Sequence, residues 1–175
     1  MHPPADCRLC DLHKGRTAIV LPAGDPSAKV CLVGEAPGEM EDIKGSPFVG
    51  RAGKLLDRIL EEEGVDRASL LITNTVKCRP PGNRDPTEEE MAACRPFLID
   101  ELRGREFVVA LGRSACRSLA GINAPMKEIA NKKMELDLGD EKLIFIPTYH
   151  PAACIYSKAA RDALKETVRM IKGLL

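Results

Sequence analysis

Four cysteines are the residues whose spacing points most directly to chemistry. Cys7 and Cys10 are separated by two residues near the start of the chain, and Cys78 and Cys94 follow in its middle. Disulfides are typical of small secreted domains, whereas a chain of 175 residues can bury a core without them and no secretory leader precedes Cys7. We therefore expect a cytoplasmic protein whose four reduced thiolates bind one metal centre.

The spacing favours one kind of metal centre over another. Structural zinc sites prefer two short Cys-x2-Cys pairs, and only Cys7 and Cys10 form such a pair here. The second pair spans a loop and the start of a predicted helix, which favours an iron–sulfur cluster and leaves zinc as the alternative. The remaining cysteines lie singly within apolar runs, where small buried hydrophobic residues are expected: Cys31, Cys116 and Cys154.

Carboxylates gather directly after the first apolar run of the chain. Glu35, Glu39, Glu41 and Asp42 fall within eight residues and repel one another. Such repulsion is tolerated on a solvated loop, which is the more ordinary interpretation, and it is useful where one carboxylate activates water. The same Gly-Glu-Ala-Pro-Gly turn exposes backbone N–H groups, including that of Ala36, which can hold a carbonyl oxygen or an anion.

Four other side chains stand where strands are predicted to end or in the loops that follow. Asn74 interrupts an apolar run, and a buried amide needs hydrogen-bonding partners. His150 precedes a proline, Phe48 lies in a loop where an aromatic ring is available for stacking, and Ser114 begins a helix that could bind phosphate. Each has an ordinary structural explanation by itself. Together, an aromatic face, an edge-reading amide, a histidine and carboxylates describe a pocket for a nucleobase.

The elements that would position these residues alternate along the chain. Short apolar runs predict strands, and segments of helical period lie between them, so we expect a three-layer α/β/α sandwich with a central four-stranded parallel sheet. The strands are predicted at 29–34, 70–76, 107–111 and 143–148, the helices at 50–63, 87–102, 114–120 and 159–172, and a short hairpin at 124–138. In such sheets the ligand site lies at the carboxyl ends of the strands, where the polar residues gather here.

Composition and charge set broad limits on function. The chain is 44% hydrophobic, has zero formal net charge, and has no apolar stretch long enough to cross a bilayer, so we expect one domain over residues 1–175 that does not insert into membranes. Acidic side chains outnumber basic ones up to residue 102, whereas basic ones predominate beyond it. This basic C-terminal part permits a polyanionic partner without requiring one.

The motifs in their order and spacing resemble those of the family-four uracil-DNA glycosylases. The resemblance extends from Cys7 to the final helix and is carried by residues 34–42 (GEAPGEMED), 47–53 (PFVGRAG), 73–81 (TNTVKCRPP) and 150–153 (HPAA). It implies hydrolysis of the N-glycosidic bond of uracil in single- or double-stranded DNA, with the target nucleotide flipped into the pocket. It also implies a four-iron four-sulfur cluster on the two cysteine pairs.

The resemblance further assigns roles to individual residues. Phe48 would stack on uracil, Asn74 would read its N3–H and O4, and His150 would donate to O2, helped by backbone N–H groups of the turn at Ala36. Glu35 or Asp42 would orient the attacking water. Three further roles are implied: exclusion of the thymine methyl by Glu41, a phosphate grip at Ser114, and filling of the vacated base stack by Ile155 or Tyr156.

Two other functions fit part of the sequence. An iron–sulfur electron carrier or DNA-sensing module would explain the cysteines. A zinc-stabilised hydrolase of a free nucleotide is the second alternative. One subgroup of similar enzymes links itself to its product through a histidine in an inserted basic loop after the second strand, but residues 81–86 (PGNRDP) hold neither insertion nor histidine. We therefore expect ordinary turnover without self-linkage to the product. We further expect a monomeric prokaryotic enzyme that associates with the nucleoid through DNA binding and has no lyase step.

Overall fold

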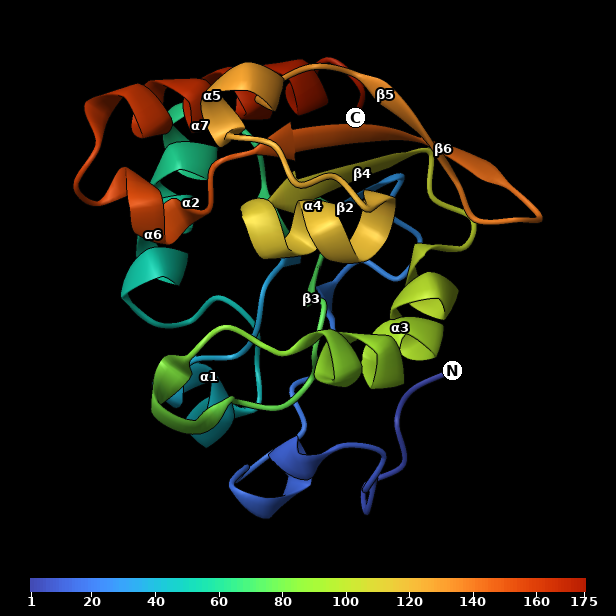
Figure 1. Cartoon of the computed structure of the whole chain (residues 1–175). Helices are drawn as coiled ribbons and strands as arrows, with labels where there is room; N and C mark the ends of the chain where they lie inside the picture. The colour runs from blue at the N-terminus through green and yellow to red at the C-terminus, as the bar shows by residue number, and fades with distance from the viewer.

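A six-stranded mixed sheet runs through the protein, and helices cover both of its faces (Figure 1). The computed structural model describes all 175 residues. The strand order is β1-β3-β2-β4-β6-β5. The strands are β1 (Ala23–Gly24), β2 (Val30–Gly34), β3 (Leu71–Asn74), β4 (Phe107–Leu111), β5 (Met134–Asp137) and β6 (Lys142–Thr148).

The expected α/β class is confirmed, but the expected size of the sheet is not. Neighbouring strands among β3, β2, β4 and β6 pair in parallel, while β1 pairs with β3 and β5 pairs with β6 in the antiparallel sense. The sheet is therefore mixed and has two edge strands more than the predicted four. The hairpin predicted within 124–138 is wrong, because this segment holds one helix and one strand, and that strand pairs with β6.

The helices follow the strands in the order expected of parallel crossovers. The longer ones lie within one residue of the predicted bounds, and three short ones were not predicted. They are α1 (Glu39–Lys44), α2 (Arg51–Glu62), α3 (Glu88–Leu102), α4 (Arg113–Ala120), α5 (Met126–Ile129), α6 (Pro151–Cys154) and α7 (Lys158–Lys172), with 3-10 turns η1 (Asp11–Lys14), η2 (Arg67–Ser69) and η3 (Pro81–Asn83). At the start of α3, Thr87 and Glu90 form a reciprocal capping box. No helix has the length and apolar character needed to cross a membrane.

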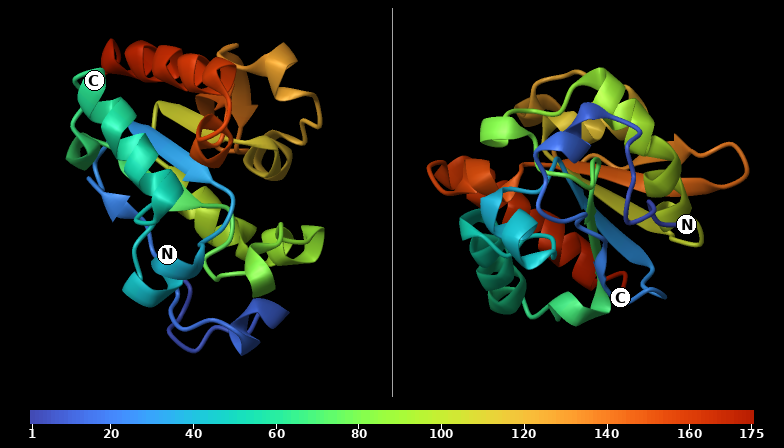
Figure 2. Two further views of the ribbon diagram at one scale, coloured as in Figure 1. Left: turned by 90° about the vertical axis from the view of Figure 1, so that its left-hand side faces the viewer. Right: turned by 90° about the horizontal axis from the view of Figure 1, so that it is seen from below.

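Two apolar layers fix these helices against the sheet. Residues such as Leu56 and Ile59 of α2 and Leu164 of α7 pack on one face, and Leu98 of α3 and Leu119 of α4 pack on the other. Figure 2 shows α2 and α7 on one side of the strands and α3 and α4 on the opposite side. This packing holds the carboxyl ends of the parallel strands at one edge, where the loops converge.

A third, smaller apolar cluster ties down the N-terminal segment. Leu12 and Val76 pack with Met91 of α3 and with two cysteines, Cys78 and Cys94. In Figure 1 this segment lies below α1 and α3. The first residues of the chain are thereby joined to the loop that follows β3.

Candidate active site

A cavity opens where the carboxyl ends of β2, β3 and β6 meet. Five of its lining residues were predicted site residues, namely Ala36, Glu41, Phe48, Asn74 and His150, and Ala52 and Gly53 complete the lining. Three predicted residues, Glu35, Asp42 and Ser114, are not among those that line it. The structure thus brings together the residues expected to recognise a base, whereas the expected water activators lie outside the lining of the cavity.

Phe48 is held in an unusual conformation against the floor of this cavity. Its φ is 53°, in the left-handed region, and its ring is buried with its centroid 5.6 Å from that of His150. A side chain at Gly34 would clash with the ring, and one at Gly53 would clash with the Phe48 carbonyl. Arg67 of η2 donates to the carbonyl oxygens of Pro47 and Phe48 at 2.7 and 2.9 Å. The loop therefore presents the ring at a fixed position.

Glu41 lies at the cavity, but its carboxylate is occupied by the backbone. It accepts hydrogen bonds from the N–H groups of Gly38, Val49 and Gly50 at 3.2, 3.2 and 2.7 Å. Side chains at Gly38 or Gly50 would press on these oxygens. Glu41 thus joins the turn after β2 to the loop that carries Phe48, a positioning role that the sequence did not reveal.

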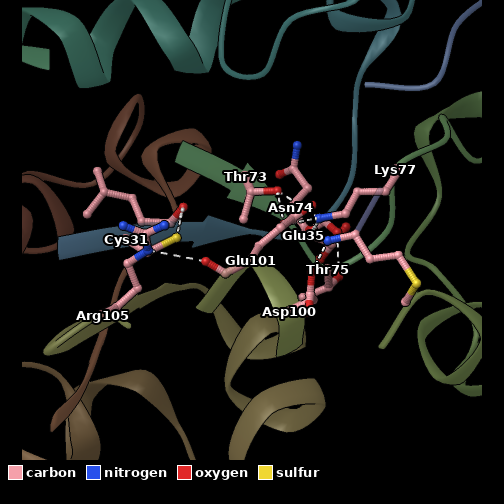
Figure 3. A network of polar contacts seen from close by, with 11 residues as sticks. Cys31, Glu35, Thr73, Asn74, Thr75, Lys77, Asp100, Glu101 and Arg105 are labelled. Carbon is pink, nitrogen blue, oxygen red and sulfur yellow. Dashed lines mark hydrogen bonds and ion pairs between the residues drawn. The ribbon is translucent and has the colours of Figure 1, made fainter. Parts of the chain in front are cut away.

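Asn74 ends β3 in register with Gly34 of β2 and is buried. Its backbone carbonyl accepts from Lys77, whereas its side-chain amide belongs to no hydrogen bond within the protein and lines the cavity. In Figure 3 the amide points away from the Lys77 network. Because its donor and acceptor atoms line the cavity and have no partner in the protein, this amide is available to a ligand.

Lys77 forms a buried network beneath Asn74 (Figure 3). Its fully buried Nζ lies 2.7 Å from each of three acceptors, the Asn74 carbonyl oxygen, Thr73 Oγ1 and Glu101 Oε2. The Thr73 hydroxyl also donates to Glu101 at 2.8 Å. An ammonium removed from water in this way is stable only because a carboxylate and two further oxygens surround it. The network anchors the end of β3 to α3.

His150 caps α6 and presents a defined tautomer. Its Nδ1 accepts a hydrogen bond from the Ala152 N–H at 3.0 Å, so the neutral ring carries its proton on Nε2. Burial of the ring lowers the pKa of His150 to about 4. Gly112, at φ 94°, leaves room for the His150 Cβ. At neutral pH the side chain is therefore an uncharged donor at the cavity.

Glu35 stands at the end of β2 within a small polar cluster. Burial is the main cause that raises the pKa of its carboxyl, a hydrogen bond with Ser114 lowers it, and the nearby Asp85 raises it. Arg117 of α4 opposes this rise through its charge. Asp85 lies in the loop after η3 and was not predicted as a site residue, since nothing in its sequence neighbourhood indicated that this loop returns to β2.

Asp42 has a different environment from Glu35. Its buried carboxylate accepts from the backbone N–H groups of Thr17 and Ala18 at distances from 2.9 to 3.1 Å. It does not line the cavity. These contacts give Asp42 a structural role, which is to hold the N-terminal segment against α1.

The four predicted ligand cysteines converge on one site. Cys7, Cys10, Cys78 and Cys94 line a single cavity, together with Arg16 and Lys77 among others. No three His, Cys, Asp or Glu side chains are arranged to hold one metal ion. The other cysteines, Cys31, Cys116 and Cys154, are buried in the apolar layers as expected.

Hydrogen-bond donors surround these sulfur atoms. Arg16 Nη1 lies 3.6 Å from Cys78 Sγ and 2.8 Å from the Cys7 carbonyl oxygen. The backbone N–H of Lys77 donates to Cys94, whose thiol pKa is nevertheless raised to about 11 by burial. Arg16 was missed from the sequence because the thiol that it contacts, Cys78, is 62 residues further along the chain. The ammonium of Lys77, the residue before Cys78, is paired with Glu101 and not with a sulfur atom.

The residues expected to fill the vacated base stack lie beyond α6. Ile155 is half-buried, while Tyr156 is 82% exposed and projects from the surface. Arg51 at the start of α2 donates to the Tyr156 hydroxyl at 3.1 Å and lies 5.5 Å from its ring centroid. Tyr156 is thus the more accessible of the two candidates.

The fold and the cavity define a class of protein that sequence comparison identifies. A family model described as the uracil DNA glycosylase superfamily matches residues 21–172. A type-4 uracil-DNA glycosylase of Saccharolobus solfataricus is 41% identical over 176 residues, covering 97% of this chain and 82% of that relative. A second, from Thermotoga maritima, is 40% identical over 174 residues, covering 97% of this chain and 89% of that relative. The chain belongs to the type-4 uracil-DNA glycosylases.

Similarity to another type of the superfamily is less extensive. A type-5 uracil-DNA glycosylase of Thermus thermophilus is 35% identical over 116 residues, which is 55% of this chain and 51% of that relative. The type-4 relatives therefore match across the N-terminal cysteine pair and the final helix, and the type-5 relative matches over a shorter stretch.

Proposed function

We propose that this protein removes uracil from DNA by hydrolysing the N-glycosidic bond, the first step of base excision repair. The observation that carries the proposal is the unpartnered side-chain amide of the buried residue Asn74, which lines the same cavity as Phe48 and the neutral His150. A uracil ring needs a stacking surface, a group that both accepts and donates along one edge, and a donor at O2. The type-4 relatives support the same activity.

Recognition of the base is proposed to depend on Asn74 and Phe48. The Asn74 oxygen accepts from uracil N3–H and its amide nitrogen donates to O4, while Phe48 stacks on the ring. Cytosine presents the opposite donor and acceptor at these two positions, so it leaves the amide unpaired in a buried site. The base reaches the cavity after the nucleotide is flipped from the stack.

His150 is proposed to stabilise the departing base. As the glycosidic bond breaks, negative charge grows on uracil O2, and a donor aimed at that oxygen acts more strongly in the transition state than in the ground state. The Ala152 N–H supports this role because it fixes the proton of His150 on Nε2. The low pKa of His150, caused by burial, supports a neutral donor rather than a general acid.

Glu35 is proposed to orient the attacking water. Its raised pKa, due chiefly to burial, makes its carboxylate a better proton acceptor than an exposed glutamate. Asp42 is the weaker alternative because its oxygens are engaged by Thr17 and Ala18. Glu41 is proposed to limit the cavity near ring C5 through the loop that it positions, and Ser114 to contribute to the phosphate grip while it binds Glu35.

The two cysteine pairs are proposed to ligate a four-iron four-sulfur cluster. The fit is supported by one cavity shared by the four side chains and by N–H donors at the sulfur atoms, which stabilise thiolate charge in such centres. Arg16 and the Lys77 backbone supply those donors. The cluster would contribute structure, because Glu35, Asn74 and His150 lie outside its cavity.

The test is release of uracil by the iron-loaded protein. It is incubated with single- and double-stranded oligonucleotides that contain one uracil, and the abasic sites are then cleaved with alkali. We expect strand breaks that depend on alkali, since no lyase step is proposed, and a single-turnover rate that falls by about 10²–10³ in His150→Ala. Absence of alkali-dependent breaks in both substrates would favour an electron carrier instead. Asn123→Asp, an exposed position outside the cavity, serves as the control variant.

A further inference from the structure

A second and larger cavity lies beside the uracil site, between α2, α6 and α7. It measures about 420 Å³, which is within the range of cavities that hold small ligands. Its floor is apolar and is formed by Leu55 and Ile59 of α2 and by Ile155 after α6. We call this cavity the flanking groove.

Basic side chains line the rim of the flanking groove. They are Arg51, Arg58, Arg161 and Lys165, and the only acidic one is Glu62. Glu62 is 2.8 Å from Lys165, so this pair is neutral and three cations remain in excess. An apolar floor with a cationic rim is complementary to a chain of sugars and phosphates.

The basic side chains of the rim differ in the contacts that they make within the protein. Arg161 donates through Nε and Nη2 to the Cys154 carbonyl oxygen, and Arg51 contacts Tyr156. Arg58 is exposed and takes part in no hydrogen bond or ion pair within the protein. Arg58 is therefore the rim cation that makes no direct polar contact within the protein.

The groove is continuous with the uracil site through two short chain segments. Arg51 directly precedes Ala52 and Gly53, which line the uracil cavity, and Ile155 follows His150 by one turn of helix. Figure 2 shows α2, α6 and α7 grouped on the same side of the sheet. A strand whose flipped nucleotide occupies the uracil cavity would thus pass by this rim.

We propose that the flanking groove binds the sugar–phosphate backbone of the DNA next to the flipped nucleotide, with Arg58 as a phosphate contact. This inference rests on the proposed function and extends the DNA-binding surface along α2, away from the sheet edge. Because the contact is to phosphate rather than to a base, it is independent of sequence. Its contribution falls as salt concentration rises, since each phosphate contact releases condensed counterions.

The experiment measures DNA affinity as a function of salt for the iron-loaded Arg58→Ala variant. The probe is a duplex with a stable abasic-site analogue, in a long form and in a form too short to reach the groove, and binding is followed by fluorescence anisotropy. We expect affinity for the long duplex to fall about fivefold, and the slope of log K against log salt to decrease by about 1. Affinity for the short duplex and the single-turnover rate at saturating DNA should be unchanged.

Lys127→Ala is the matched control, because Lys127 is an exposed cation of α5, and this helix packs through Met126 and Ile129 in the apolar layer on the face opposite α2. Equal affinity and equal salt slope for the two variants on the long duplex would overturn the proposal. So would an equal loss of affinity on the long and short duplexes. Since the probe contains no uracil, this result is separate from the uracil-release assay, whose failure would overturn the proposed function instead.

Discussion

At the scale of single residues, the site combines groups whose protonation is set by their surroundings. Burial lowers the pKa of His150 and keeps its ring neutral. The pKa of Glu35 is raised by burial and by Asp85, and it is lowered by the hydrogen bond with Ser114. Asn74 carries no charge and relies on geometry alone. Each residue can therefore be tested by a change that alters one property and leaves its shape almost intact.

Asn74→Asp should reduce selectivity for uracil over cytosine. A carboxylate cannot donate to uracil O4 but can accept from the cytosine amino group, so the ratio of cytosine to uracil excision should rise by about tenfold or more. The measurement is single-turnover excision from oligonucleotides that contain either base. An unchanged ratio would remove Asn74 from base recognition.

The pH dependence of the reaction should respond in opposite directions to two substitutions beside Glu35. Ser114→Ala removes the hydrogen bond that lowers the pKa of Glu35, so the acid limb of kcat/KM should move to higher pH. Asp85→Asn removes the carboxylate that raises this pKa, so the limb should move to lower pH. If both variants keep the native profile, the acid limb does not report Glu35.

At the scale of elements, strands with continuous apolar runs were predicted from the sequence, and the shortest strands were missed. Strands buried on both faces, such as β2 and β4, show continuous apolar runs and were found. β1 has only two residues, and β5 has a single buried position, so neither carries a pattern that identifies a strand. The position of Asn74 in a predicted strand also indicated that it belongs to the site. The approach of Asp85 to Glu35 could not be predicted, because it depends on how the loop after η3 folds back.

Lys77→Met should destabilise the connection between β3 and α3. It leaves Glu101 buried without its cation, and we expect the free energy of unfolding to fall by about 3 kcal/mol. Lys77→Met/Glu101→Gln removes the stranded charge and should recover part of this loss in urea titrations of the iron-loaded protein. Uracil excision should remain slow in the double variant, because the bond from Nζ to the Asn74 carbonyl is still missing. Full recovery of rate would show that this bond does not position Asn74.

At the scale of the whole molecule, the N-terminal segment and the sheet edge form one connected structure. The cysteine motifs predicted a shared metal site, but its donors could not be predicted, because Arg16 approaches Cys78 only after the segment folds over α3. The division of roles between Glu41 and Asp42 was equally hidden, since both belong to one acidic run. The prediction of a single domain stays a prediction.

Loss of the proposed cluster should therefore affect structure before chemistry. Cys94→Ala should abolish absorbance near ~400 nm, typical of such clusters, and lower the thermal unfolding midpoint. Cys116→Ala, which removes a buried thiol outside the cluster site, should keep the absorbance. Retained colour in Cys94→Ala would exclude this residue as a ligand.

The six-residue helix α1 has one further consequence. Its adjacent residues Glu41 and Asp42 bind two different parts of the chain. Glu41 binds the loop that carries Phe48, and Asp42 binds the backbone of Thr17 and Ala18. A protease that trims the N-terminal segment would thus release one side of α1 while the other side still supports the aromatic ring. Trimming should therefore lower the stability of α1 and of the N-terminal segment before it changes the position of Phe48.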